Sequence, residues 1–422
     1  MSQEIAKQPK ESASKWRYFR RALLAALVLL SVIAAPYVYF YFEYLRPTEA
    51  IPLVDESQTD QSIHSDAETG SLLTKILNES RERYGLPSLS AAVGYSGEVQ
   101  WAAATGYADI ESRKLASTLS SYRIGSTSKA LTAVLFARMI DQGKINIDAP
   151  ISKYYSTVPQ QYSGVTARQL ASHTAGVRHY SLPNWWMANW ENYSKVQYKN
   201  VEEGLSLISD DSLLFPPGSD FKYSTFGYSL LSREMELAGK SDFSALLKKD
   251  LLVPANMPNT SIDDQTAVPE RVSFYNAESG LYRPAISINS SYKIAGGGLL
   301  STPSDLVNLG LQLLGDSLIS ERTKKLMWTP VPIANGQQNP ENYGLGWRIG
   351  SSSRIIGPED PVAIIHHGGV QPGGACFYAI IPNSGLVVAV TANSGSGAAR
   401  SAVQDVAYEL ARTLINKEKV PR

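Results

Sequence analysis

The stretch YRIGSTSKALTAVLFARMIDQG, residues 122–143, predicts both a core element of the fold and the chemistry of the chain. From residue 130 to residue 140 it is apolar nearly all round, which is typical of a helix buried on every side. Ser126 and Lys129 stand at the start of this helix, three residues apart and therefore on one face. The helix dipole favours negative charge on the serine oxygen, and a lysine in a dry site loses proton affinity and can serve as a base. The two residues are therefore a candidate nucleophile and base.

Ser-x-x-Lys is a short pattern, and the chain has four copies, which begin at Ser12, Ser126, Ser219 and Ser290. An isolated copy is more often a helix cap followed by a solvated lysine than a catalytic pair. Ser219 follows a Pro-Pro-Gly turn, Ser290 lies in a polar Asn-Ser-Ser segment, and Ser12 falls in the predicted cytoplasmic tail described below. Only the copy at Ser126 opens a buried helix, so we take it as the candidate site.

The composition excludes some classes of function. The chain has 422 residues, with 39 basic and 39 acidic side chains and no net charge. A nucleic-acid-binding protein usually carries a basic surplus, so we expect no nucleic-acid partner. The apolar content of 43% supports a large core, and the single cysteine, Cys376, allows no intramolecular disulfide.

Residues 22–42 predict a membrane anchor, because they form 21 residues without a charge. Six cations and two acids precede them, so the N-terminus should stay in the cytoplasm while the rest is exported. In a bacterium this means a single-pass protein of the inner membrane with a periplasmic domain. A cleaved signal peptide is the alternative, but Pro36 follows Ala35 and Ile33 occupies the −3 position, which makes a poor cleavage site. The predicted divisions are a cytoplasmic tail (1–21), a transmembrane anchor (22–42), a flexible acidic linker (43–70) and a globular domain (71–422).

The order of elements in the globular part predicts an α/β fold of the α+β kind. A helix over residues 71–85 and a β-hairpin over 89–109 open the domain, and strands at 362–369, 375–382 and 386–394 precede a last amphipathic helix at 398–416. The middle, residues 127–290, is mostly helical and loop-like. Since the strands arrive as hairpins, we expect an antiparallel sheet flanked by helices with an inserted helical subdomain.

Three further stretches contain candidate site residues. Tyr223 stands directly before an apolar helix, where its phenol can shuttle a proton. His173 lies at a predicted helix C-terminus in VTARQLASHTAGVRHY. His366 and His367 end a strand and are followed by glycines, which allow a backbone N–H to approach a substrate closely. Adjacent residues of a strand point to opposite faces, so these two histidines should not bind one metal, and we expect no metal site.

Taken together, these stretches resemble the serine β-lactamase and penicillin-binding-protein superfamily. The similarity is to its class C-like branch of D-aminopeptidases, DD-peptidases and esterases, and two stretches, SHTAGVRHY and FKYSTFGYSLLS, are similar to mitochondrial serine β-lactamase-like proteins of animals. YRIGSTSK matches the family's Ser-x-x-Lys motif, YST at 223–225 lies where the family has Tyr-x-Asn, and HHG at 366–368 stands for Lys-Thr-Gly or His-x-Gly. The segments GGGLLSTPSDL and YGLGW are also family-like, and the resemblance covers about residues 71–412.

The resemblance implies an acyl-enzyme mechanism on a small-molecule or peptide substrate, with no cofactor. Ser126 would be the nucleophile, Lys129 and Tyr223 would move its proton, and the backbone N–H groups of Ser126 and Gly369 would form the oxyanion hole. The implied residues on the substrate side of the site are His366, His367, Gly368, Gly369 and Thr225.

Two departures from the family pattern favour a peptidase, amidase or esterase over an efficient β-lactamase. Thr225 replaces the asparagine that contacts a substrate amide, and His366 replaces a lysine that attracts a carboxylate. A histidine is largely neutral at pH 7. The alternative to catalysis is a tethered binding or sensor module of the same fold without turnover.

Overall fold

The centre of the fold is an antiparallel sheet in the order β11-β12-β13-β14-β3-β4-β2, with β5 paired to β4. A computed structural model describes residues 10–180, 191–264 and 268–421. The N-terminal hairpin lies in the middle of the sheet because β14 pairs with β3, which joins the two ends of the domain. The strands of this sheet are β2 (Asp60–Ile63), β3 (Ser88–Tyr95), β4 (Glu98–Asp109), β5 (Lys114–Leu115), β11 (Arg348–Gly357), β12 (Asp360–Gln371), β13 (Gly374–Ile381) and β14 (Leu386–Ala392).

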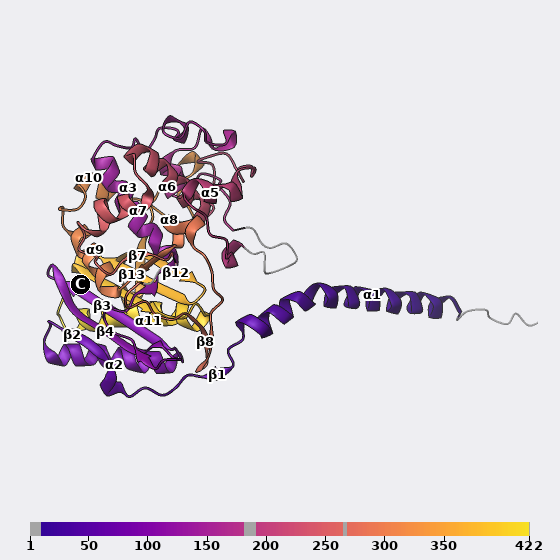
Figure 1. The fold of residues 1–422 in the computed structure, drawn as a ribbon, viewed down its shortest axis with the longest axis horizontal. Helices are drawn as coiled ribbons and strands as arrows, with labels where there is room; N and C mark the ends of the chain where they lie inside the picture. The colour runs from indigo at the N-terminus through magenta and orange to yellow at the C-terminus, as the bar shows by residue number, and fades with distance from the viewer. Residues whose placement is uncertain (1–9, 181–190, 265–267, 422) are drawn as a thin grey trace, which may run out of the picture.

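Helices cover both faces of this sheet, and the strand sequences reflect it (Figure 1). In β14, Val387 and Ala389 belong to one hydrophobic cluster, whereas Val388 and Val390 belong to the other. Helices α2 (Ala67–Arg83) and α11 (Gly397–Asn416) pack on the second face, and α9 (Pro303–Leu314) packs on the first. A strand that is buried on both faces reads as a continuous apolar run, which is what the last strand shows.

The helical subdomain lies over the first face of the sheet (Figure 1). At its centre is α3 (Ser128–Asp141), whose residues from Ser128 to Ala137 are all buried. The other helices are α4 (Ala167–Ala171), α5 (Val201–Leu205), α6 (Thr225–Gly239), α7 (Phe243–Leu247), α8 (Ile294–Gly297) and α10 (Glu321–Met327). The prediction of an antiparallel sheet flanked by helices, with an inserted helical subdomain, is confirmed.

Two small three-stranded sheets join distant segments. One consists of β1 (Glu49–Ala50), β9 (Leu281–Pro284) and β8 (Tyr275–Glu278), and the other of β6 (Tyr122–Arg123), β10 (Leu299–Ser301) and β7 (Ser261–Ile262). The second sheet contacts the turn that contains Ser126, because Ile124 N donates to Leu299 O at 3.2 Å.

Two local features differ from the sequence predictions. The segment 43–70, predicted as a flexible linker, contributes β1 and the edge strand β2, and α2 begins at Ala67 rather than at residue 71. Its backbone gains hydrogen bonds from strands already formed, which composition does not reveal. The strand β11 was not predicted, since it is a partly exposed edge strand with a polar sequence and no regular alternation.

The N-terminal helix α1 (Lys10–Phe40) projects away from the domain (Figure 1). It continues as a π-helical turn, Tyr41–Leu45. Residues 15–45 form a span of 31 residues that is long and apolar enough to cross a membrane, and its most apolar part buries nothing against the domain. A signal sequence near the N-terminus has the same properties. Residues 1–9 of the predicted tail lie outside the described residues.

Candidate active site

Ser126 lies in a 3₁₀ turn, Gly125–Thr127, immediately before α3 and against the end of β12. Gly125 has a φ of +51°, and a Cβ there would lie 2.8 Å from Val370 N. A Cβ at Gly369 would lie 1.9 Å from Ile124 O and 2.8 Å from Ser126 N. Only glycine allows this contact between the two main chains. It brings the Ser126 amide beside Gly369, as the oxyanion-hole prediction requires.

Lys129, the second residue of α3, is fully buried and lies one turn beyond Ser126. Its Nζ lies 3.4 Å from Ser126 Oγ and donates to Gly296 O at 2.6 Å and Thr225 Oγ1 at 3.1 Å. No carboxylate is among these partners. Burial holds the pKa of Lys129 well below its usual range, and the nearby cations Arg348 and Lys293 lower it further. The amine is therefore suited to accept a proton near neutral pH.

Tyr223 completes the group, because Lys129 Nζ lies 4.7 Å from the centre of its ring. Burial raises the pKa of Tyr223 to about 12, while hydrogen bonding to Ser126 and the charge of Arg348 oppose the rise. The phenol is thus protonated at neutral pH and available as a proton donor. Arg348, the first residue of β11, lies 5.5 Å from the centre of the Tyr223 ring and forms an ion pair with Glu341.

Two cavities meet at Ser126. One, of about 390 Å³, is lined by Tyr223, Arg348, His366 and the glycines of β12, and reaches Arg400 of α11. The other, of about 220 Å³, is lined by Lys293 and Gln371, among others. Ser126 is therefore accessible from two sides.

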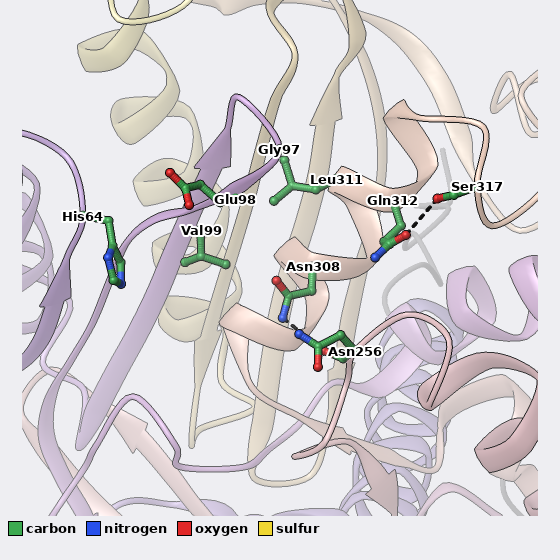
Figure 2. Close-up of a pocket in the computed structure, with 9 residues that line it drawn as sticks. All are labelled: His64, Gly97, Glu98, Val99, Asn256, Asn308, Leu311, Gln312 and Ser317. Atoms are coloured by element: carbon green, nitrogen blue, oxygen red, sulfur yellow. Dashed lines mark hydrogen bonds between the residues drawn. The ribbon is translucent and has the colours of Figure 1, made fainter.

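A larger hollow of about 530 Å³ lies away from this site, between the β3–β4 turn and α9 (Figure 2). His64, Glu98 and Asn308 are among the residues that line it, and no lysine is. It lacks a paired nucleophile and base, so the candidate active site is at Ser126.

Comparison with known proteins agrees with this geometry. The β-lactamase family model matches residues 73–412. The chain belongs to the β-lactamase family. It is 25% identical to the human mitochondrial serine β-lactamase-like protein LACTB, over 79% of this chain and 78% of that protein. It is 26% identical to penicillin-binding protein 4* of Bacillus subtilis, over 65% of this chain and 61% of that protein.

The fold is also that of a D-amino acid amidase from Ochrobactrum anthropi, with a TM-score of 0.70 at 18% identity over 83% of this chain and all of the amidase. These matches confirm the resemblance seen in the sequence. This β-lactamase-family protein is accordingly a serine hydrolase, in a family with peptidase, amidase and esterase relatives.

The two histidines of β12 have different surroundings in this family member, as the alternation of a strand predicts. His366 lines the larger cavity, and its ring centre lies 5.3 Å from that of Phe377. Burial lowers the pKa of His366 to about 4. His367 is fully buried, with Nδ1 2.7 Å from Gly368 O and Nε2 2.9 Å from Tyr343 Oη. The predicted substrate-side role of His367 is therefore not supported, because its side chain lines neither cavity.

Thr225 also differs from its predicted place on the substrate side. It is the first residue of α6, is 1% exposed, and accepts a hydrogen bond from Lys129 instead of lining a cavity. Two histidines hold this helix start in place, since Ser224 N donates to His173 Nδ1 and Thr225 N donates to His179 Nδ1, both at 3.1 Å. Thr225 therefore positions the lysine.

The sequence interpretation missed three residues beside the nucleophile: Arg348, Lys293 and Gln371. Arg348 directly follows the family-like YGLGW segment, which was a usable signal. Lys293 belongs to the Ser290 copy of Ser-x-x-Lys, which was set aside as part of a polar segment. Among the described residues, no three or more His, Cys, Asp or Glu side chains are grouped so as to hold a metal ion.

Proposed function

We propose that this protein is a membrane-anchored serine hydrolase that cleaves an amide, peptide or ester bond through an acyl-enzyme on Ser126. The observation that carries the proposal is the buried Lys129 amine, 3.4 Å from Ser126 Oγ, with a lowered pKa and no carboxylate partner. In the neutral amine, two N–H bonds point to Gly296 O and Thr225 Oγ1. Its lone pair is then free for the serine proton.

In the acylation step, Ser126 Oγ attacks the substrate carbonyl carbon while its proton passes to Lys129. The bond to the leaving group breaks, and the leaving atom takes a proton from Tyr223, which regains one from Lys129. The N–H groups of Ser126 and Gly369 stabilise the negative carbonyl oxygen of the intermediate. A water molecule then gives a proton to Lys129 while its hydroxyl adds to the acyl carbon. The bond between that carbon and Ser126 Oγ breaks, the acid product leaves, and Ser126 Oγ regains its proton through the same groups.

The substrate is an amide, peptide or ester in preference to a β-lactam. Thr225 presents no side chain to either cavity where the family uses asparagine to contact an acylamino group. His366, with a pKa lowered to about 4, carries no charge at neutral pH. Both departures weaken the recognition that an efficient β-lactamase needs.

We also propose that α1 anchors the protein in the membrane with residues 1–21 in the cytoplasm and the hydrolase domain on the opposite side. The apolar span and the basic residues before it support this orientation. Protease treatment of intact spheroplasts tests it. The domain should be digested from outside, and protection of the domain contradicts the orientation.

Fluorophosphonate labelling of the full-length protein in detergent, followed by intact-mass measurement and peptide mapping, tests the catalytic proposal. We expect one adduct, on Ser126, and none in Lys129→Ala. If a folded sample forms no adduct, the serine is not activated and a tethered binding module is the better account.

A further inference from the structure

The smaller of the two cavities at Ser126 contains an unusual combination of buried polar groups. We call it the Lys293 pocket, because Lys293, the last residue of a 3₁₀ turn, lines it. Gln371 and Asn192 also line it, and none of the residues that line it is an aspartate or glutamate. A cavity beside a nucleophile with a few convergent polar groups is a typical ligand-binding site.

Lys293 is 2% exposed, and its side-chain amine has no ion pair or hydrogen bond among the described residues. Its Nζ lies 5.4 Å from the ring centres of Tyr180 and Tyr292. Asp263 is the carboxylate whose charge favours the protonated form of Lys293, and it is already bound by Arg123 at 2.6 Å and Arg271 at 2.9 Å. Burial accordingly lowers the pKa of Lys293 to about 7. A buried cation without a counter-charge is costly, and a bound anion removes that cost.

Gln371, the last residue of β12, provides a second and independent indication of a ligand. Its side chain is 5% exposed, and neither its amide nitrogen nor its amide oxygen has a hydrogen-bond partner among the described residues. Buried amides are nearly always paired in folded proteins. The Gln371 N–H₂ and the Lys293 amine are both donors, which is what a carboxylate requires.

The positions of the catalytic groups indicate which part of a substrate enters this pocket. Tyr223, the proton donor to the leaving group, lines the other cavity and not the Lys293 pocket. The leaving group therefore departs through the larger cavity, and the part that stays on Ser126 occupies the smaller one.

We propose that the Lys293 pocket binds a carboxylate on the acyl part of the substrate, so that the enzyme prefers acyl groups with a second, anionic end. This inference rests on the proposed function. A succinyl or glutaryl type of acyl group has this chemistry, with one carbonyl for Ser126 and one carboxylate for Lys293 and Gln371.

The test compares 4-nitrophenyl hemisuccinate with 4-nitrophenyl butyrate on the full-length protein, since the two acyl chains are of similar length and differ in charge. We expect kcat/KM to be at least tenfold higher for the hemisuccinate. Lys293→Met should lower the ratio of the two kcat/KM values by roughly tenfold to a hundredfold, the effect of losing one charged hydrogen bond. Gln371→Leu should lower it by roughly threefold to tenfold. Lys248→Met, at an exposed lysine distant in sequence from the pocket, should keep the wild-type ratio.

Intact-mass measurement during turnover separates the possible outcomes. A succinyl adduct on Ser126 that forms faster than the butyryl adduct supports the inference. Two results overturn it. One is equal acylation rates for the two esters, and the other is a ratio of their kcat/KM values that is unchanged in both Lys293→Met and Gln371→Leu. If neither ester acylates Ser126 but a fluorophosphonate does, the inference is wrong and the proposed function stands. If no reagent labels Ser126, the proposed function fails and the inference fails with it.

Discussion

Replacing Gly369 by alanine should slow acylation of Ser126 by about 10²–10³-fold, the usual cost of losing one donor of an oxyanion hole. A Cβ at this position would lie 1.9 Å from Ile124 O, 2.7 Å from Thr127 N and 2.8 Å from Ser126 N. All three atoms belong to the main chain, so rotation of a side chain cannot relieve the clash. The end of β12 and the serine turn must move apart, and the two amides can no longer point to one oxygen.

The same substitution should cost roughly 1–3 kcal/mol of stability, as overpacking typically does, and leave the protein folded. Gly350→Ala is the matched control, because that glycine of β11 has no atom within 4 Å of the added Cβ. The assay is the second-order rate constant for fluorophosphonate labelling, with thermal unfolding measured on the same samples. A folded Gly369→Ala protein that labels at the wild-type rate would refute the assignment of this amide to the oxyanion hole.

Three other predictions concern buried ionisable groups. Because burial lowers the pKa of Lys129, the rate of fluorophosphonate labelling should rise with pH and level off well below about pH 10.4, the ordinary lysine pKa. A labelling rate that rises only near that pH contradicts Lys129 as the base. Glu234 is buried without a partner among the described residues, which raises its pKa from 4.5 to about 8. The free energy of unfolding should therefore fall by roughly 3–5 kcal/mol between pH 4.5 and pH 8, at ~1.4 kcal/mol per pKa unit. In denaturant unfolding, Glu234→Gln should remove this dependence of stability on pH. Arg348→Met should lower kcat for an ester about tenfold, because the phenol of Tyr223 loses the cation that favours its ionisation, and an unchanged kcat excludes that role.

Local sequence was enough to predict the parts of the site that one element provides. Ser126 and Lys129 are neighbours on a helix that is apolar all round, so their geometry follows from helical periodicity. The opposite orientations of His366 and His367 follow in the same way from strand alternation. The sheet was predictable because the strands arrive as hairpins.

The remaining parts depend on contacts between distant segments, which local sequence does not contain. Lys293 and Gln371 line one pocket although 78 positions separate them in the chain. Thr225 was placed on the substrate side by motif position alone, whereas the packing of α6 against α3 directs it to Lys129. The edge strand from residues 60–63 exists because β4 offers it a hydrogen-bonding partner.

The most direct test of the central claim is a rapid-quench experiment with an ester substrate on the full-length protein. The intact mass should increase by one acyl group early in turnover, and peptide mapping should place that group on Ser126. Lys129→Ala should accumulate no such species. Turnover that proceeds without a covalent adduct, or that persists in Ser126→Ala, would contradict the acyl-enzyme account.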